Sequence, residues 1–210
     1  MSKSKGNILN PLEIIDNYGV DELRYYLMKE VSHGSDGNIS LKSLENCINS
    51  DLANNYGNLC QRVFSFIKNN CNNEVSKVSD FSDTDKKLIK ETADLEKDLK
   101  NYMENQNLNE YIKSVIKISF LTNKYINDEE PWKLKKNNIK KMNNILYLAL
   151  VQIAKISILL NPIIPKTTLK VLDSLNVEKS SRSLDFLEGK DIFMNKIKTK
   201  HLEILFKKIL

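Results

Sequence analysis

The sequence predicts a mainly α-helical protein, in which a helical bundle follows a short N-terminal segment with little strand. Over most of the chain, apolar residues recur at intervals of three and four, which is the period of one helix face. Strand and helix patterns never alternate for long enough to build a parallel sheet, so no βαβ nucleotide-binding unit is expected. A chain of 210 residues with 41% hydrophobic residues can bury one or two real cores.

Two short helices are predicted in the N-terminal segment. Asn10 followed by Pro11 has the pattern of a helix start, with Asn as the cap and Pro at the first helical position. Gly19 is a stop signal for that helix. A second helix is expected over residues 20–31, because its apolar residues recur at helical spacing.

A loop connects these helices to the bundle. Residues 32–38, SHGSDGN, are rich in Gly, Ser and Asp, which predicts a turn or loop, and a short strand is predicted at Ile39. We therefore expect two domains, a small unit over residues 1–40 and a helical bundle over residues 41–210.

A long helix is predicted to open the bundle. Ser40 can cap it, and the helical pattern reaches about Ile67. Its apolar residues form a one-sided seam, which requires partner helices. The seam consists of Leu52, Tyr56, Leu59, Val63 and Phe66. A polar linker is expected over residues 69–79.

Four further helices are predicted over residues 80–106, 109–126, 140–160 and 166–175. The second of these is expected to face inward with Ile112, Val115, Ile116, Ser119 and Phe120. Residues 145–160 are the most apolar stretch, but polar residues interrupt it and it is shorter than the roughly 20 residues that a bilayer requires. It therefore predicts a buried core helix, and residues after 176 give a mixed pattern.

Charge and cysteine usage limit the possible functions. Residues 133–210 contain 16 Lys/Arg and 6 Asp/Glu (+10), whereas residues 1–132 contain 16 and 21 (−5). The basic part is compatible with a polyanionic partner or with a solvated lysine-rich surface. The three cysteines lack CxxC spacing and the chain has two histidines, so neither a metal site nor a complete catalytic dyad or triad is expected. A reduced, cytoplasmic protein is the simplest inference.

The chain starts with a basic loop, MSKSKGN. The Lys3 ammonium is a mobile point charge suited to phosphate, and its neighbours Ser2, Ser4 and Gly6 leave the loop free to close over a ligand. The alternative is an ordinary polar chain terminus.

Two further features are suited to reading a nucleobase. Asn58 and Arg62 lie four residues apart on the long helix and share a face offset from the seam, where an amide and a guanidinium can read a base edge. Trp132 follows Pro131 at a helix break, where an exposed indole would be a stacking platform. The alternatives are a helix-surface hydrogen bond for the first pair and a core position for Trp132.

Taken together, these stretches resemble the methionyl-tRNA synthetases, which are class I enzymes. MSKSKGN is similar to the family's KMSKS loop without its leading Lys. NPLEIIDNYGVDELRYYLMKEVSHGSDGNIS is similar to the stem-contact segment that follows that loop. NSDLANNYGNLCQR resembles the first helix of the anticodon-binding domain, and EEPW resembles its Trp-bearing corner. The resemblance covers nearly the whole chain and implies the anticodon-binding helical bundle of class I aminoacyl-tRNA synthetases.

The resemblance implies roles for two groups of residues. In the complete enzyme, the loop residues Met1, Ser2, Lys3 and Ser4 would bind ATP, and Lys3 would be catalytic, stabilising the departing pyrophosphate as methionine attacks the α-phosphate. Asn58, Arg62 and Trp132 would read the CAU anticodon of tRNA(Met), especially its first cytosine.

The resemblance also implies what lies outside this chain. The family's Rossmann domain with its HIGH motif is absent, so the chain alone is expected neither to activate methionine nor to charge tRNA. ATP with magnesium is implied for the complete enzyme, and no cofactor or metal for this chain. A cytoplasmic monomer without membrane association is expected. The competing readings are the same module from a leucyl, valyl or cysteinyl enzyme, and a helical interaction protein without an RNA partner, in which Trp132 would be buried.

Overall fold

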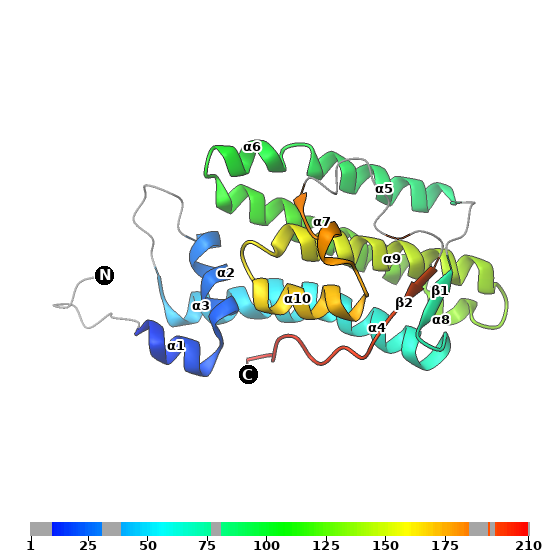
Figure 1. The fold of residues 1–210 in the computed structure, drawn as a ribbon, viewed down its shortest axis with the longest axis horizontal. Coiled ribbons are helices and arrows are strands. Elements are labelled where there is room, and N and C mark those ends of the chain that lie inside the picture. The colour runs from blue at the N-terminus through cyan, green and yellow to red at the C-terminus, as the bar shows by residue number, and fades with distance from the viewer. Residues whose placement is uncertain (1–9, 31–38, 77–80, 185–192, 194–195, 210) are drawn as a thin grey trace.

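The computed structural model describes residues 10–30, 39–76, 81–184, 193 and 196–209. Its longest helical stretches lie side by side along the long axis of the molecule (Figure 1). They are the continuous helix made of α3 (Leu41–Cys47), the π-helix η2 (Ile48–Gly57) and α4 (Asn58–Asn70), together with α5 (Asp83–Glu96), α7 (Leu108–Glu129) and α9 (Ile139–Leu160). The predicted mainly α bundle is confirmed.

The N-terminal helices α1 (Pro11–Asn17) and α2 (Val20–Glu30) begin as the sequence predicts. The Asn10 side chain accepts a hydrogen bond from the backbone N–H of Leu12 at 3.1 Å, and Pro11 takes the first helical position. Gly19 has a φ of +118°, which side-chain-bearing residues rarely adopt, and it forms the turn between α1 and α2. Residues 31–38 lie outside the described residues, and so does the predicted loop.

Helix α2 is tied to the connection between α9 and α10. The Arg24 guanidinium donates hydrogen bonds to the carbonyl oxygens of Pro162 and Ile163, both at 2.8 Å. The buried Asp21 carboxylate accepts a hydrogen bond from the Thr167 N–H at 2.7 Å, in the first turn of α10 (Pro165–Ser174). The N-terminal helices therefore have fixed positions relative to the bundle.

The long helix begins at Ser40, as predicted, with a reciprocal capping box between Ser40 and Ser43. The strand predicted at Ile39 is wrong, because this residue lies in irregular chain directly before the cap. The seam residues Leu52, Tyr56, Leu59 and Val63 are all buried, and Phe66 packs half-buried at the edge. The ten-residue π-helical stretch was not anticipated from the sequence.

Gly57 ends the π-helix in a tightly packed position. A Cβ atom at this residue would lie 2.8 Å from the Leu52 carbonyl oxygen and 3.0 Å from the Phe206 ring. Only glycine allows both approaches. The next residue is Asn58, which is the first residue of α4.

The polar linker predicted over residues 69–79 is wrong in part. The strand β1 (Glu74–Ser76) pairs antiparallel with β2 (Lys196–Lys198), and Val75 faces Ile197. Positive φ angles at Asn72 and Asn73 turn the chain from α4 into β1. The partner strand lies about 120 positions away in the sequence, so no local pattern could predict the pairing.

The remaining helices follow the prediction with shifted boundaries. The single helix predicted over residues 80–106 is divided into α5 and α6 (Leu99–Glu104). Helix α9 is long and apolar enough to cross a membrane, but 83% of its most apolar window is buried inside the protein. It is the core helix that the sequence predicts: the Tyr56 hydroxyl lies 2.7 Å from its Ser157 hydroxyl, and the Tyr111 hydroxyl donates to its Leu159 carbonyl oxygen at 2.7 Å.

A 3-10 turn η3 (Lys179–Ser181) follows α10, and the chain after β2 runs along α4 (Figure 1). We call residues 196–209 the C-terminal strap. The strap buries Leu202 and Phe206, and the Phe206 ring centroid lies 6.4 Å from that of Tyr56. The Asn49 amide donates to the Ile209 carbonyl oxygen and accepts from its N–H, both at 2.9 Å. The strap therefore packs against the π-helix.

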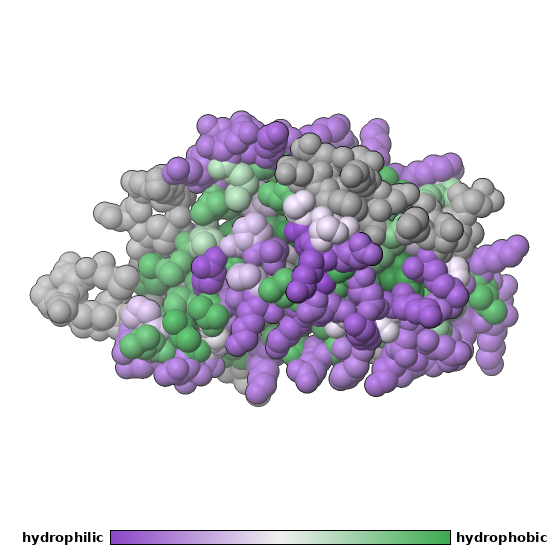
Figure 2. All heavy atoms as spheres, viewed as in Figure 1, coloured by the Kyte–Doolittle hydropathy of each residue, from purple (hydrophilic) through white to green (hydrophobic). Residues whose placement is uncertain are grey.

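Exposed apolar side chains gather at the end of the molecule that carries α1 and α2. Figure 2 shows that apolar atoms gather over α1 and α2, whereas polar side chains cover most of the rest of this face. Leu12, Val20 and Leu27 in these two helices are exposed. Exposed apolar residues that lie together are typical of an interaction surface.

Candidate nucleic-acid interface

An open groove of about 710 Å³ runs between the long helix and α7. Residues Asn54, Asn58 and Arg62 of η2 and α4 form one wall, and Lys113, Lys117 and Phe120 of α7 form the other. The walls share a polar and basic character: among the charged residues that line the groove, four are cationic (Lys29, Arg62, Lys113 and Lys117) and one is acidic, Asp51.

Arg62 and Trp132 meet at one end of the groove. The guanidinium carbon of Arg62 lies 5.7 Å from the Trp132 ring centroid, within cation–π range. The same guanidinium donates a 2.8 Å hydrogen bond to the Asn127 side-chain oxygen of α7. Trp132 is 42% exposed, which argues against the core reading. Asn58 lines the groove one turn before Arg62. The three residues singled out from the sequence thus lie at the same end of the bundle.

The corner that carries Trp132 has a fixed backbone. Helix α7 ends at Glu129, the next residue Glu130 takes a left-handed conformation with a φ of 43°, and Pro131 then starts the short helix α8 (Pro131–Leu134). Glu129 forms a 2.8 Å ion pair with Lys141 of α9. Burial alone would raise the pKa of Glu129, but hydrogen bonds from Lys141 and Thr84 hold this pKa below its ordinary value. The indole is therefore presented by a rigid support.

Asn55 connects the two walls beneath the groove. Its side-chain oxygen accepts a hydrogen bond from the Ser119 hydroxyl at 2.9 Å, and its backbone oxygen accepts one from the Asn123 amide at 3.1 Å. The Asn123 side-chain oxygen is buried and has no hydrogen-bond partner in the described part of the chain. This unpaired acceptor lies in a residue that lines the groove.

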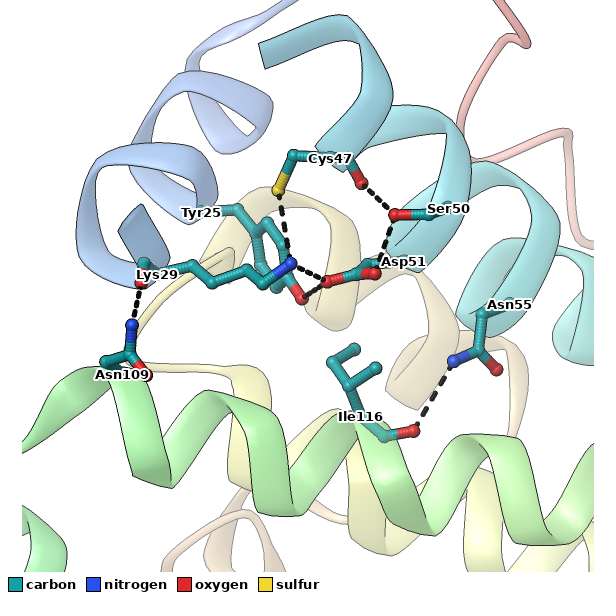
Figure 3. Close-up of polar contacts among 8 residues, drawn as sticks. All are labelled: Tyr25, Lys29, Cys47, Ser50, Asp51, Asn55, Asn109 and Ile116. Atoms are coloured by element: carbon teal, nitrogen blue, oxygen red, sulfur yellow. Dashed lines mark hydrogen bonds and ion pairs between the residues drawn. The ribbon is translucent and has the colours of Figure 1, made fainter. Parts of the chain in front are cut away.

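A polar cluster closes the other end of the groove (Figure 3). The Asp51 carboxylate accepts hydrogen bonds from the Tyr25 and Ser50 hydroxyls at 2.7 and 2.8 Å, and pairs with the Lys29 ammonium at 2.8 Å. Burial and the Asp51 charge raise the pKa of Tyr25, so its hydroxyl stays protonated and donates. The negative charge of Asp51, the only acidic side chain among the described lining residues, is therefore compensated within this cluster.

The predicted inward face of α7 is wrong at Phe120. Ile112, Val115 and Ser119 are buried as predicted, and Ile116 is half-buried, but Phe120 is 52% exposed and lines the groove. The Lys117 ammonium lies 5.0 Å from its ring centroid. Sequence reasoning missed this pair, although the Lys-x-x-Phe spacing on one helix face could have indicated it.

The remaining predicted site residues belong to the N-terminal loop. Met1, Ser2, Lys3 and Ser4 lie outside the described residues. Within the described residues, no group of three His, Cys, Asp or Glu side chains could hold a metal ion. Burial raises the pKa of the Cys47 thiol to about 12, so this cysteine near the Asp51 cluster is not a nucleophile at neutral pH.

Comparisons with known proteins agree on one family. Residues 1–64 match the family described as "tRNA synthetases class I (M)", and residues 75–210 match the "Anticodon binding domain of methionyl tRNA ligase". The chain is 36% identical over 182 residues to the methionine–tRNA ligase of Brucella suis, covering 87% of this chain and 35% of that protein. It is 34% identical over 211 residues to that of Caldanaerobacter subterraneus, covering 100% and 33%.

A solved structure shows the same arrangement of helices. Mycobacterium tuberculosis methionyl-tRNA synthetase bound by methionyl-adenylate superimposes with a TM-score of 0.91 at 28% sequence identity, over 99% of this chain and 41% of that one. The chain thus spans about a third of the length of the curated relatives it matches.

Proposed function

The chain belongs to the methionine–tRNA ligase family, and from this we propose that it is the part of such an enzyme that recognises the anticodon of tRNA(Met). The complete enzyme would attach methionine to that tRNA through methionyl-adenylate, using ATP with magnesium. The observation that carries the proposal is the Trp132 corner: an indole exposed on a rigid support, with Arg62 over its ring and a basic groove beside it.

The geometry suggests how the first anticodon base is read. An unpaired base stacks on the open surface of Trp132, as bases do on aromatic platforms. Arg62, held by Asn127, is a pure donor and suits the ring nitrogen and carbonyl acceptors of cytosine. The Asn58 amide oxygen can accept from the exocyclic amine, which uracil lacks. This division of roles favours cytosine.

Groove charge supports a polyanionic partner. Four cationic side chains and one carboxylate line the groove, and that carboxylate is neutralised by Lys29 and two hydroxyl donors. The net positive field attracts phosphates and steers their approach.

The two alternatives from the sequence are less favoured. A leucyl, valyl or cysteinyl module is disfavoured because residues 75–210 match the anticodon-binding domain of the methionyl ligase. A helical interaction protein without RNA would bury its single tryptophan, and Trp132 is exposed.

The N-terminal residues have a proposed role in the complete enzyme. We propose that Met1, Ser2, Lys3 and Ser4 form the ATP-binding loop, with Lys3 as the catalytic cation, and that residues 1–40 act as a unit distinct from the bundle over residues 41–210. The apolar surface over α1 and α2 supports this, because it offers a face for the rest of the enzyme (Figure 2). The complete enzyme is proposed to be a cytoplasmic monomer.

Binding of RNA hairpins tests the anticodon proposal. We expect the 210-residue chain to bind a tRNA(Met) anticodon stem-loop more tightly than the same hairpin with the first anticodon cytosine changed to uracil, by roughly 1–3 kcal/mol. Fluorescence anisotropy at one fixed salt concentration measures the difference. Equal affinity for all anticodon sequences would contradict the proposal.

Neutralising the lysines after Trp132 is expected to lower the affinity for all RNA hairpins, whatever their anticodon sequence. Lys133, Lys135 and Lys136 are exposed on the corner next to the indole. Each Lys→Gln change should weaken all hairpins by a similar factor of about 3, because one phosphate contact is lost, and should flatten the logarithmic salt dependence by up to about 1. Lys90→Gln on α5, outside the groove, is the matched control and should change neither quantity.

A further inference from the structure

Phe120 occupies a position that stability does not explain. Its neighbours on α7, Val115 and Ser119, face the core, whereas the Phe120 ring lines the groove and stays half in water. Burying such a ring would be favourable by roughly 1.5–3 kcal/mol. Departures from a consistent apolar pattern are often found at functional sites.

One cation lies over this ring, and a second lines the groove further along the same helix. Lys117 lies over the ring at 5.0 Å, and Lys113 lines the groove one turn earlier. Within the described residues Lys113 forms an exposed ion pair with Glu110 at 2.7 Å, whereas Lys117 has no acidic partner there. An aromatic ring beside ammonium groups is the combination that binds an unpaired nucleotide, the ring for the base and the cations for its phosphate.

Phe120 is separate from the Trp132 corner. Asn127, which holds Arg62, lies seven residues further along α7, a distance of about 10 Å along the helix axis at 1.5 Å per residue. Successive bases in a stacked strand are only about 3.4 Å apart. A base on Phe120 therefore cannot be the one that stacks on Trp132 or its stacked neighbour.

We propose that Phe120 and Lys117 form a second nucleotide-binding site, in which another unpaired base of the same tRNA loop stacks on Phe120 and its phosphate lies against Lys113 and Lys117. This inference rests on the proposed anticodon-binding function. The loop then enters the groove as an extended strand, held by aromatic rings at two separate points. The basic groove could attract an acidic peptide as well. A nucleotide fits better, because its base can stack on the exposed Phe120 ring and its phosphate can pair with the lysines.

Variants at Phe120 separate stacking from general apolar contact. Using the 210-residue chain and the CAU stem-loop, we expect Phe120→Ala and Phe120→Leu to weaken binding roughly 5–20-fold, and Phe120→Tyr to stay within about twofold. Lys117→Gln should weaken binding about threefold and reduce the salt slope. Lys124→Gln, exposed on the same helix but outside the groove, is the control and should have no effect.

Abasic substitutions identify the base involved. At one loop position other than the first anticodon base, an abasic substitution should weaken binding of the hairpin to the wild-type protein. The same substitution should not weaken binding to the Phe120→Ala variant any further. Thermal unfolding of each variant, expected to be unchanged because Phe120 is exposed, confirms that the fold is retained.

Three results would overturn the inference, each recognisable. If Phe120→Ala binds within twofold of wild type while Trp132→Ala is weakened, the second site is wrong and the anticodon function stands. If Phe120→Leu binds as well as Phe120→Tyr, the ring does not stack on a base. If the unchanged chain does not prefer the CAU stem-loop over an unrelated hairpin, the proposed function fails and the second site fails with it.

Discussion

Replacing Trp132 with alanine is expected to weaken binding of the CAU stem-loop by roughly 1–3 kcal/mol, or about 5–150-fold. The change removes the platform on which the first anticodon base is proposed to stack. It also removes the ring over which Arg62 lies, so the guanidinium loses one of the two contacts that fix its orientation. Both losses act on the same base.

The fold should tolerate this change. Trp132 is 42% exposed, and the corner that carries it is held by backbone geometry at Glu130 and by the ion pair between Glu129 and Lys141. Anisotropy titrations give the affinity, and far-UV circular dichroism gives the melting temperature. Trp132→Phe should retain part of the binding. A Trp132→Ala protein that unfolds would instead assign the residue to the core.

Gly57→Ala is expected to destabilise the protein by roughly 1–3 kcal/mol, although a Gly→Ala change within a helix usually stabilises a protein. In an ordinary helix interior, alanine is about 1 kcal/mol more favourable than glycine. Here the new Cβ would lie 2.8 Å from the Leu52 backbone oxygen and 3.0 Å from the Phe206 ring. The backbone oxygen cannot move without distorting the π-helix. Urea unfolding followed by circular dichroism measures the effect.

A double variant separates the two clashes. Phe206→Leu removes the ring contact and leaves the Leu52 oxygen in place. If the strap were the main obstacle, Gly57→Ala would cost less in the Phe206→Leu background. We expect the cost to persist, because the clash with Leu52 lies within the helix itself. A Gly57→Ala protein as stable as wild type would show that η2 can change to a regular α-helix at little cost.

Local chemistry in the sequence was enough to predict most of the bundle. Asn10 and Ser40 each satisfy a backbone requirement of a helix start, so those two starts could be predicted. The seam from Leu52 to Val63 followed the helix period and is buried. The resemblance to the methionyl family, based on short motifs, is confirmed by the family match.

The features that were missed depend on distant parts of the chain. Strand β1 has three residues and exists because β2 pairs with it. The π-helix fits around Gly57 and Phe206, which are far apart in sequence. Phe120 matches the apolar period of α7, and only the packing of neighbouring helices decides that its ring faces the groove.

The candidate site was predictable only where its residues lie close together in the sequence. The four-residue spacing of Asn58 and Arg62 placed them on one face, and Pro131 indicated an exposed corner for Trp132. The hydrogen bond from Arg62 to Asn127 joins helices 65 positions apart, so no pattern within one helix could predict it. The nucleotide-binding roles of these residues stay predictions until the binding experiments are done.

The position of the C-terminal strap determines the expected order of folding. Its hydrogen bonds to Asn49 join positions 160 residues apart. Closing so long a loop costs conformational entropy before these hydrogen bonds can stabilise the folded state. Helices form within about a microsecond, so the long helix is expected to form first and the strap to dock late. The ring that packs against Gly57 therefore arrives after the helix it touches, and the helix segment leading into Asn58 reaches its final packing only at the end of folding.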